Sequence, residues 1–229
     1  STPIKSSAAS DVYKRQSGYS NDDLLALYTL TGGIPKYVEL FCDNQALTID
    51  KMYDFVFSEN SLFIDEGRNL LITEFGKNYG TYFSILSEIA NGHYTQGEIE
   101  SALGGTAIGG YLSKLENVYN LITRERPIFA KPGTKKNVRY IIGDNFLNFW
   151  FKYIERNRSY IELQNFDDLR QLAKADYPTY SGRVLEKYFK QKLAETGGFK
   201  EIGSWWETKS SIGKQRINSY EIDLSLIHI

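Results

Sequence analysis

Basic side chains gather between residues 124 and 139 and are the first candidates for chemistry in this sequence. Six bases stand there against one acid, Glu125. The six are Arg124, Arg126, Lys131, Lys135, Lys136 and Arg139. Because nucleic acids carry a charged phosphate at every nucleotide, a basic cluster of this kind suits phosphate contact. These six residues are therefore the predicted nucleic-acid-binding residues.

The composition excludes several other kinds of site. Cys42 is the only cysteine, which excludes an internal disulfide and a cysteine cluster for zinc and fits a reducing cytoplasm. The two histidines, His93 and His228, are too few for a histidine-based metal site, and the sequence pattern offers no Ser-His-Asp triad. The chain carries 27 basic and 28 acidic residues, so its overall charge gives no nucleic-acid signature.

The elements before the basic cluster predict a winged helix-turn-helix over residues 80–143. A helix over residues 82–90 ends at Asn91 and Gly92. Thr95 and Glu98 have the spacing of a capping box, which opens a short second helix. Thr106 is the predicted cap of a third helix, in the place of a recognition helix.

Two β-prone runs complete this predicted module. They cover residues 121–129 and 138–142, and residues 131–137 join them in a basic, turn-forming link that would be the wing. A three-helix core with a hairpin is also common as a protein-docking or linker module. The third helix argues against sequence-specific DNA binding, because Lys114 is its only base. In addition, Gly109 and Gly110 each destabilise a helix by about 1 kcal/mol relative to alanine. Both interpretations stay open.

Helical patterns dominate the rest of the chain. Residues 21–23 are predicted to cap one helix, and Pro35 opens the next after a glycine stop. Residues 47–76 and 145–160 follow as helices, the second apolar nearly all round. A helix over residues 181–196 precedes strands at 199–206 and 216–223. The predicted fold class is mainly α with α+β parts.

Both ends of the chain resemble translated sequencing adapter. Residues 6–16 match an in-frame translation of a widely used transposase adapter, and residues 224–229 match the reverse complement of its mosaic end. We therefore expect residues 1–16 and 224–229 to be adapter-derived tails and residues 17–223 to be a fragment of a longer reading frame. Such tails should pack poorly, although the second can imitate a strand that continues from Asp223.

Four stretches of the chain resemble, in order, a family of archaeal and bacterial ATPases of the AAA and STAND group. The stretches are LTGGIPKYVELF (residues 30–41), DEGRNLL (65–71), GDNFLNFWF (143–151) and NRS (157–159). That family ends in a domain of unknown function numbered 234, which is similar to restriction-endonuclease-like nucleases. The resemblance implies a helical ATPase lid over residues 17–79, a winged helix over 80–143, a helical connector over 144–180 and a truncated endonuclease-like domain over 181–223.

The resemblance also implies cofactors and a partner. In such ATPases the Gly-x-Pro of the lid lies near the adenine, so Gly33 and Pro35 would be cofactor-binding residues. ATP and Mg²⁺ would serve the full-length parent, and none is expected for the fragment alone, which has no Gly-x-x-x-x-Gly-Lys-Ser/Thr phosphate cradle. The partner would be a P-loop domain preceding this segment in the same chain.

By the same resemblance, Glu186 matches the helix acid and Asp223 the metal-binding aspartate of the endonuclease-like fold. Both would be catalytic and metal-binding, because Mg²⁺ prefers oxygen ligands and uses one or two carboxylates with phosphate oxygens. The chain stops before the strand that should carry the lysine, so this fragment is expected to be inactive. Alternatively, Glu186 is a solvated helix residue and Asp223 lies on an ordinary edge strand.

Two classes of function follow. The first is an ATP-controlled, nuclease-like protein that acts on or binds nucleic acid, with DNA contacted through the wing. The second is a nucleotide-dependent switch that contacts proteins and has no nuclease activity. No apolar run approaches the roughly 20 residues needed to cross a bilayer, so neither a membrane partner nor a location outside the cytoplasm is expected.

Overall fold

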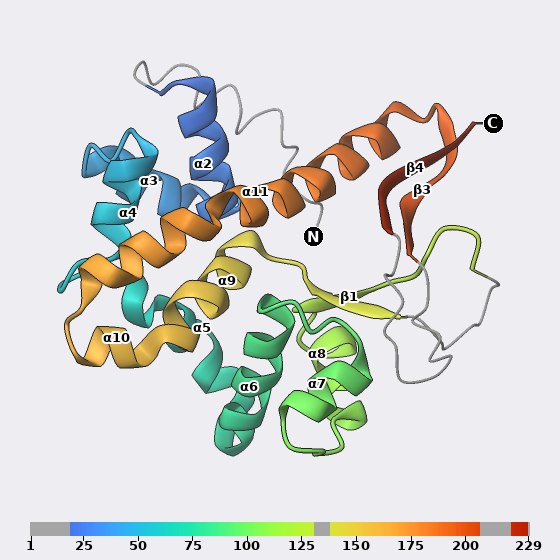
Figure 1. The fold of residues 1–229 in the computed structure, drawn as a ribbon, viewed down its shortest axis with the longest axis horizontal. Coiled ribbons are helices and arrows are strands. Elements are labelled where there is room, and N and C mark those ends of the chain that lie inside the picture. Colours follow the sequence, from blue (N-terminus) through green and yellow to red (C-terminus); the bar gives the residue numbers. More distant parts are fainter. Residues whose placement is uncertain (1–18, 131–137, 207–220, 229) are drawn as a thin grey trace.

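The fold is mainly helical, with its strands in two small antiparallel pairs (Figure 1). The structure is a computed structural model that describes residues 19–130, 138–206 and 221–228. This architecture agrees with the predicted mainly α fold with α+β parts. The helices are α2 (Asn21–Thr31), α3 (Pro35–Asp43), α4 (Ile49–Val56), α5 (Phe63–Phe75), η1 (Gly76–Asn78), α6 (Tyr79–Ala90), α7 (Gln96–Ala102), α8 (Gly109–Asn117), α9 (Asn145–Phe149), η2 (Trp150–Ile154), η3 (Glu155–Asn157), α10 (Arg158–Glu162) and α11 (Phe166–Thr196). The strands are β1 (Ile122–Glu125), β2 (Arg139–Ile142), β3 (Phe199–Trp206) and β4 (Glu221–His228).

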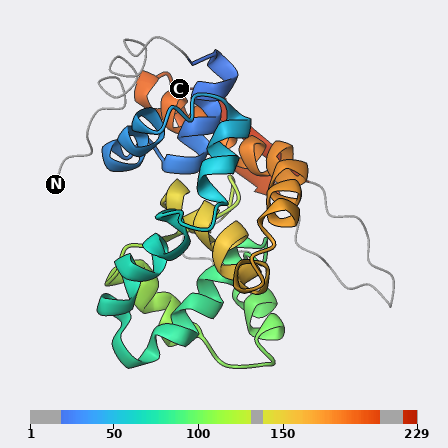
Figure 2. The same ribbon diagram turned by 90° about the vertical axis from the view of Figure 1, so that its left-hand side faces the viewer.

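Two groups of helices lie on opposite sides of a central segment. α2, α3 and α4 form one group and α6, α7 and α8 the other, with α9 and α10 between them (Figure 2). α11 crosses the molecule from the first group and ends beside β3 and β4 (Figure 1). The hairpin of β1 and β2 extends toward that same pair of strands, so the C-terminal half of α11 faces both sheets.

Local signals explain where the first helices begin. The cap of α2 is Ser20, whose Oγ accepts a hydrogen bond from the Asp23 amide, and not the predicted residues 21–23. Asp23 instead accepts the Ile49 amide at the start of α4. Pro35 opens α3 as predicted. The predicted single helix over residues 47–76 is wrong: α4 ends at Val56, and Phe57, which follows it with a non-helical backbone, is buried in the core.

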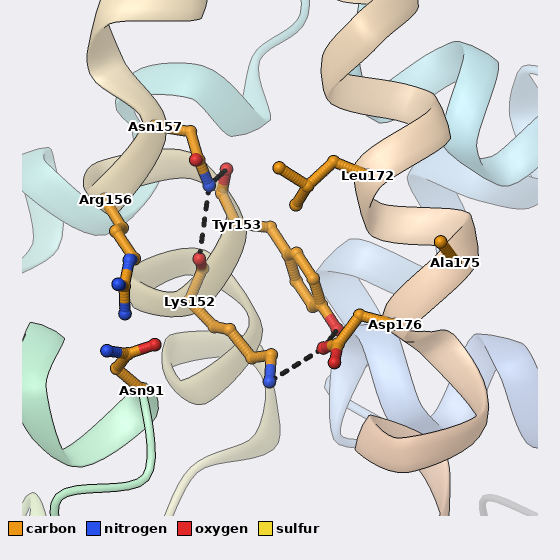
Figure 3. Close-up of a pocket in the computed structure, with 8 residues that line it drawn as sticks. All are labelled: Asn91, Lys152, Tyr153, Arg156, Asn157, Leu172, Ala175 and Asp176. Carbon is orange, nitrogen blue, oxygen red and sulfur yellow. Dashed lines mark hydrogen bonds and ion pairs between the residues drawn. The ribbon is translucent and has the colours of Figure 1, made fainter.

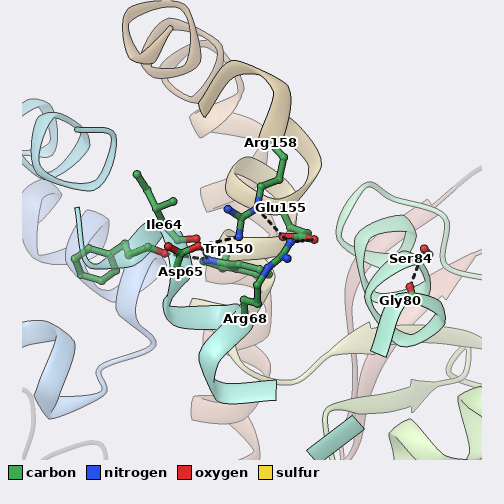
Figure 4. Close-up of polar contacts among 9 residues, drawn as sticks. Ile64, Asp65, Arg68, Gly80, Ser84, Trp150, Glu155 and Arg158 are labelled. Carbon is green, nitrogen blue, oxygen red and sulfur yellow. Dashed lines mark hydrogen bonds and ion pairs between the residues drawn. The ribbon is translucent and has the colours of Figure 1, made fainter. Parts of the chain in front are cut away.

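A close joint connects α5 to η2, a single π-helical turn (Figure 4). The indole Nε1 of Trp150 donates to the Phe63 carbonyl at 2.9 Å, and its ring lies against Gly67. A Cβ on Gly67 would lie 2.2 Å from Cδ2 of Trp150, so only glycine fits there. Arg68 pairs with Glu155 at 3.2 Å across the same contact. The residues that carry the family resemblance thus include those that form this joint.

The segment from α9 to η2 was predicted as a helix that needs cover from more than one side, and this is confirmed. Six of its large apolar side chains are at most 1% exposed. They are Phe146, Phe149, Trp150, Phe151, Tyr153 and Ile154. The segment is not a uniform α-helix, however, because it widens into the π-turn at η2 and tightens at η3.

The helices α6, α7 and α8 follow the predicted order, and β1 and β2 follow them as an antiparallel pair. Thr95 and Glu98 form the predicted capping box of α7. Thr106 does not cap α8: its hydroxyl donates to the Leu103 carbonyl, and the Ile108 amide is bound by Glu100 instead. β1 is shorter than predicted, because the chain leaves it and the Ile128 amide donates to the Ser204 carbonyl of β3.

One helix, α11, includes both the last part of the predicted connector and the helix predicted over residues 181–196. It runs unbroken for 31 residues with Pro178 inside it, and Asn165 caps its start. Contacts on either side of Pro178 hold the helix in place: Asp176 accepts from Tyr153, and the Tyr180 hydroxyl lies 3.0 Å from the Thr29 carbonyl. These contacts offset the helix-breaking cost of proline, which is about 3 kcal/mol.

The strands β3 and β4 pair antiparallel, with Trp206 opposite Glu221 and Gly203 opposite Ser225. β4 includes residues 224–228, which were predicted as an adapter-derived tail that can imitate a strand. Leu224 and Leu226 are 37% and 39% exposed in this strand. The first predicted tail, residues 1–16, lies outside the described residues.

Candidate active site

A cavity of about 490 Å³ lies between the β1–β2 hairpin, α11 and the β3–β4 pair. Its polar lining brings together four carboxylates and five bases from these elements and their neighbours. The carboxylates are Glu125, Glu186, Glu221 and Asp223, and the bases are Arg139, Lys152, Arg183, Lys187 and Lys190. The predicted catalytic residues Glu186 and Asp223, 37 positions apart, thus line one cavity, as the resemblance required.

Glu186 is held in this cavity by two neighbours. Its Oε1 atom accepts a hydrogen bond from the Ser204 hydroxyl at 3.0 Å and an ion pair from Lys190, one helical turn further along α11. The Glu186 and Lys190 side chains are 25% and 16% exposed. The carboxylate is therefore partly withdrawn from solvent and held in one orientation.

Ser204 connects Glu186 to the strand that bears Asp223. It is 6% exposed, and its Oγ lies 2.9 Å from the main-chain oxygen of Asp223 as well as 3.0 Å from Glu186. Its single proton can be donated to either oxygen, and Lys190 donates to the Ser204 hydroxyl. The contact thus fixes α11 against β4 where the two predicted carboxylates lie. The side chain of Asp223 itself is exposed.

Two lysines of α11, Lys187 and Lys190, bring positive charge to this cavity. Lys190 faces Glu186, and Lys187 donates to the Gly143 carbonyl and, at 3.3 Å, to Asn145 Oδ1. Burial lowers the pKa of Lys187, while the nearby carboxylates of Asp144 and Glu125 oppose that shift. Glu186 thus has a cationic neighbour on its own helix, whereas the lysine expected on a following strand stays a prediction. The spacing of Glu186 and Lys190, i and i+4 on one helix, was the sequence signal for this pair.

Glu125, the one acid of the basic cluster, lies in the same cavity. Burial raises its pKa, and the Glu186 carboxylate raises it further, whereas Lys190, Arg139 and Lys187 act in the opposite direction. Burial and the nearby Glu186 carboxylate thus both disfavour ionisation of Glu125. Only the folded chain brings the hairpin to α11, so no sequence pattern pointed to Glu125 as a cavity residue.

The carboxylates suit a divalent cation only together with a further ligand. In the described part of the chain, no group of three or more histidine, cysteine, aspartate or glutamate side chains could hold a metal. Mg²⁺ is commonly held by one or two carboxylates and completed by water and phosphate oxygens. Glu186 and Asp223 are the two carboxylates that the resemblance assigns to such a site, and both line this cavity.

The predicted nucleic-acid-binding residues fall into three groups. Arg124 is paired with Glu116, its Nε lying 2.6 Å from Oε1. Arg139 is paired with Glu221, and its guanidinium lies 4.2 Å from the ring centroid of Trp206. Arg126 is exposed and has no partner among the described residues. Lys131, Lys135 and Lys136 lie outside the described residues, and with them the predicted wing.

Gly33 and Pro35 lie away from this cavity, at the turn between α2 and α3. Gly33 has φ +74°, and its amide donates to the Thr31 hydroxyl at 3.1 Å. Pro35 is exposed at the first position of α3. Their local role is thus a helix stop followed by a helix start. Of the described helices, none combines the length and apolar character that a bilayer crossing needs.

Comparisons with known proteins agree with part of the resemblance. Residues 150–227 match the DUF234 family, described as archaea bacterial proteins of unknown function. The match begins within the predicted connector and ends within the predicted second tail. An uncharacterized protein of Methanocaldococcus jannaschii, MJECL04, is 34% identical over 210 residues, which cover 86% of this chain and 45% of the relative. The chain therefore spans about half the length of that relative. No solved structure matches this chain.

Proposed function

We propose that this chain is the C-terminal part of an ATPase of the AAA and STAND group, with a nuclease-like site in its last module. The observation that carries the proposal is the joint lining of one cavity by Glu186 and two lysines of α11 and by Asp223 of β4. The match to DUF234 over residues 150–227 supports it. The archaeal relative is about twice as long as the aligned part, which leaves room for a P-loop domain.

In this proposal the first helices form the lid of the nucleotide site. The turn at Gly33 and Pro35 would face the adenine of ATP bound to the P-loop domain. The joint of Gly67 and Trp150 would pass a movement of that lid to α9, since the two elements pack without space for relative sliding. The α6–β2 module would be the winged helix and the residues up to 180 the connector.

The cavity residues have separate tasks in this proposal. Glu186 and Asp223 would hold Mg²⁺, which when bound supplies positive charge to a phosphodiester and to an attacking water. Ser204 would keep the Glu186 carboxylate turned toward the cavity. Lys190 would release Glu186 and pair with the phosphate, and Lys187 would add positive charge from behind. Because Lys190 is paired with Glu186 here, the chain alone is still expected to be inactive.

Cleavage by the complete protein tests this proposal. A labelled DNA or RNA duplex is incubated with the complete protein, ATP and Mg²⁺, and the products are resolved on a denaturing gel. Glu186→Gln should lower the cleavage rate by at least about a hundredfold. Loss of a residue that only supports a metal ligand costs up to about a hundredfold, and loss of the ligand itself should cost no less. The matched control is Glu195→Gln, which removes an exposed carboxylate from the same helix. Equal rates in the two variants would refute the nuclease-like site.

A second candidate function is a nucleotide-dependent switch that binds proteins. It is favoured by the state of the basic cluster, because Arg124 and Arg139 are already paired with glutamates within the molecule. Replacing Lys131, Lys135 and Lys136 by alanine in the complete protein separates the two functions in an electrophoretic shift assay. If the wing binds DNA, the slope of log K against log salt concentration should become shallower by about 0.9 for each phosphate that the protein no longer neutralises. Unchanged DNA affinity would favour the switch.

A further inference from the structure

A second cavity, of about 460 Å³, lies where three elements meet (Figure 3). Asn91 reaches it from the end of α6, Lys152 and Arg156 from the π-turn and the turn after it, and Leu172 and Asp176 from the first half of α11. Cavities of about 300–1,000 Å³ are those that take small molecules. Lys152 also lines the first cavity, whereas Arg156 lines only this one.

The π-turn η2 sets the direction of the basic side chains here. Its widened turn leaves the carbonyls of Lys152 and Tyr153 to be bound by the Asn157 side-chain amide, at 3.4 and 3.0 Å. Such single turns occur frequently at functional sites. The turn is held by Trp150 and Phe151, which are fully buried on its other side. The positions of Lys152 and Arg156 at the cavity are therefore fixed by the core.

The charges around the cavity are not balanced. Lys152 pairs with Asp176 at 2.7 Å, and the Tyr153 hydroxyl donates to the same carboxylate at 2.5 Å. That carboxylate is thereby compensated. Arg156 has no hydrogen bond or ion pair among the described residues, and in Figure 3 its guanidinium faces the side-chain amide of Asn91. Two bases against one acid leave the lining with one positive charge and several unused donors.

We propose that this second cavity binds a small molecule through a phosphate group held by Arg156, Lys152 and Asn91. A guanidinium presents a fork of donors that matches two phosphate oxygens, and the ammonium and amide can each reach another. A phosphate offers these separated donors more oxygens and more negative charge than a carboxylate does. Leu172 and Ala175 form an apolar wall that an ester group of the ligand would contact.

The ligand would connect the α6–α8 group to the long helix. Asn91 belongs to the turn that ends α6, and Leu172 and Ala175 belong to α11, while the bases stand between them. Binding would therefore hold these elements together and raise the melting temperature of the chain. This site is independent of the nuclease-like proposal, because Arg156 touches neither Glu186 nor Asp223.

Calorimetric titration of the chain with inorganic phosphate and with phenyl phosphate, at constant ionic strength, tests the proposal. We expect one saturable site for phosphate that sodium chloride does not reproduce. Arg156→Gln should weaken binding at least about tenfold, since hydrogen bonds to charged groups contribute about that much. Lys51→Gln is the matched control, because Lys51 is an exposed base on α4 away from both cavities.

The two probes also identify the source of the phosphate. Tighter binding of phenyl phosphate, abolished in Leu172→Ser, would mean an organic phosphate ester, and equal binding would mean free phosphate. Arg156 and Leu172 are both partly or fully exposed, so these variants should keep the fold, which far-ultraviolet circular dichroism checks. Absence of saturable binding, or equal affinity in Arg156→Gln and the unmodified chain, would overturn the proposal.

Discussion

The joint between α5 and η2 and the contact between the hairpin and the last sheet are built in opposite ways. At the joint, Trp150 and Phe151 are fully buried and Gly67 leaves no room for a Cβ. At the last sheet, contacts to the rest of the molecule run through charged and polar groups such as Arg139 and Ser204. β4 even exposes half of Ile222, at 52%.

This difference separates stability from chemistry. Close apolar packing has one arrangement and resists change, because every displaced atom leaves its neighbours or overlaps them. Ion pairs at a half-exposed surface cost little to exchange for water, a metal or a phosphate. The joint therefore suits the transmission of movement, and the hairpin–sheet contact suits a site that must open to a ligand.

The largest expected effect comes from breaking the joint. Gly67→Ala should destabilise the chain by about 3 kcal/mol or more, because the new Cβ would overlap the buried indole of Trp150. Chemical denaturation followed by tryptophan fluorescence measures this. Gly80→Ala is the control: a Cβ there meets nothing within 4 Å, so the helix α6 should gain about 0.5–1 kcal/mol. Equal effects of the two changes would contradict the packing argument.

The hairpin–sheet contact should yield a smaller effect. Arg139→Gln removes the stacking on Trp206 and the ion pair with Glu221, which together stabilise the contact by about 1–2 kcal/mol. Hydrogen exchange should show faster exchange in β3 and β4 and no change in α5. The matched control is Arg126→Gln, whose free energy of unfolding should stay within about 0.5 kcal/mol of that of the unmodified chain. Loss of protection in α5 would show that the two regions are not separate.

Capping gives a third comparison, within the α6–α8 group. Thr95→Ala should cost about 1 kcal/mol, because it removes the side chain that accepts the Glu98 amide at the start of α7. Thr106→Ala should change the free energy of unfolding by less than about 0.5 kcal/mol, since Thr106 caps no helix. Thermal unfolding of both variants checks this. A larger loss of stability in Thr106→Ala than in Thr95→Ala would show that Thr106 caps α8, as the sequence predicted.

The free energy of unfolding should depend on pH through Glu125, the carboxylate of the β1–β2 hairpin that lines the first cavity. Burial raises the pKa of Glu125 above 4.5, so the folded state holds its proton more tightly than the unfolded state. The stability contribution of Glu125 is therefore present below pH 4.5 and lost as the pH rises through the folded pKa. Glu125→Gln should be more stable than the unmodified chain at pH 7, by a margin that vanishes toward pH 4.5. A constant margin would contradict this.

Local signals in the sequence predicted local structure well. The capping box at Thr95, the helix start at Pro35 and the buried face of residues 145–154 all depend on neighbours within a few positions. Thr106 failed as a cap because Glu100, eight residues before Ile108, binds the amide that a cap would bind. The helix predicted to begin at residue 181 begins at Phe166 instead, because tertiary contacts of Asp176 and Tyr180 hold α11 unbroken through Pro178.

The candidate site was only half predictable for the same reason. Glu186 and Asp223 came from resemblance, and the helix-to-strand order was enough to bring them to one cavity. Lys190 was not predicted, although its helical spacing from Glu186 could have pointed to it. Glu125, Arg139 and Ser204 join the site only because the hairpin packs against the last sheet, a contact between residues about 80 apart, such as Arg139 and Glu221. No local pattern encodes such a contact.

The central claim is that Glu186 and Asp223 form one metal-binding site, and anomalous diffraction tests it most directly. Crystals of the complete protein are soaked in Mn²⁺, which takes the oxygen ligands that Mg²⁺ takes. We expect an anomalous peak in contact with carboxylate oxygens of both Glu186 and Asp223. The peak should be absent in Glu186→Gln and kept in Glu195→Gln. A cavity with no peak, in which Lys190 still pairs with Glu186, would contradict it.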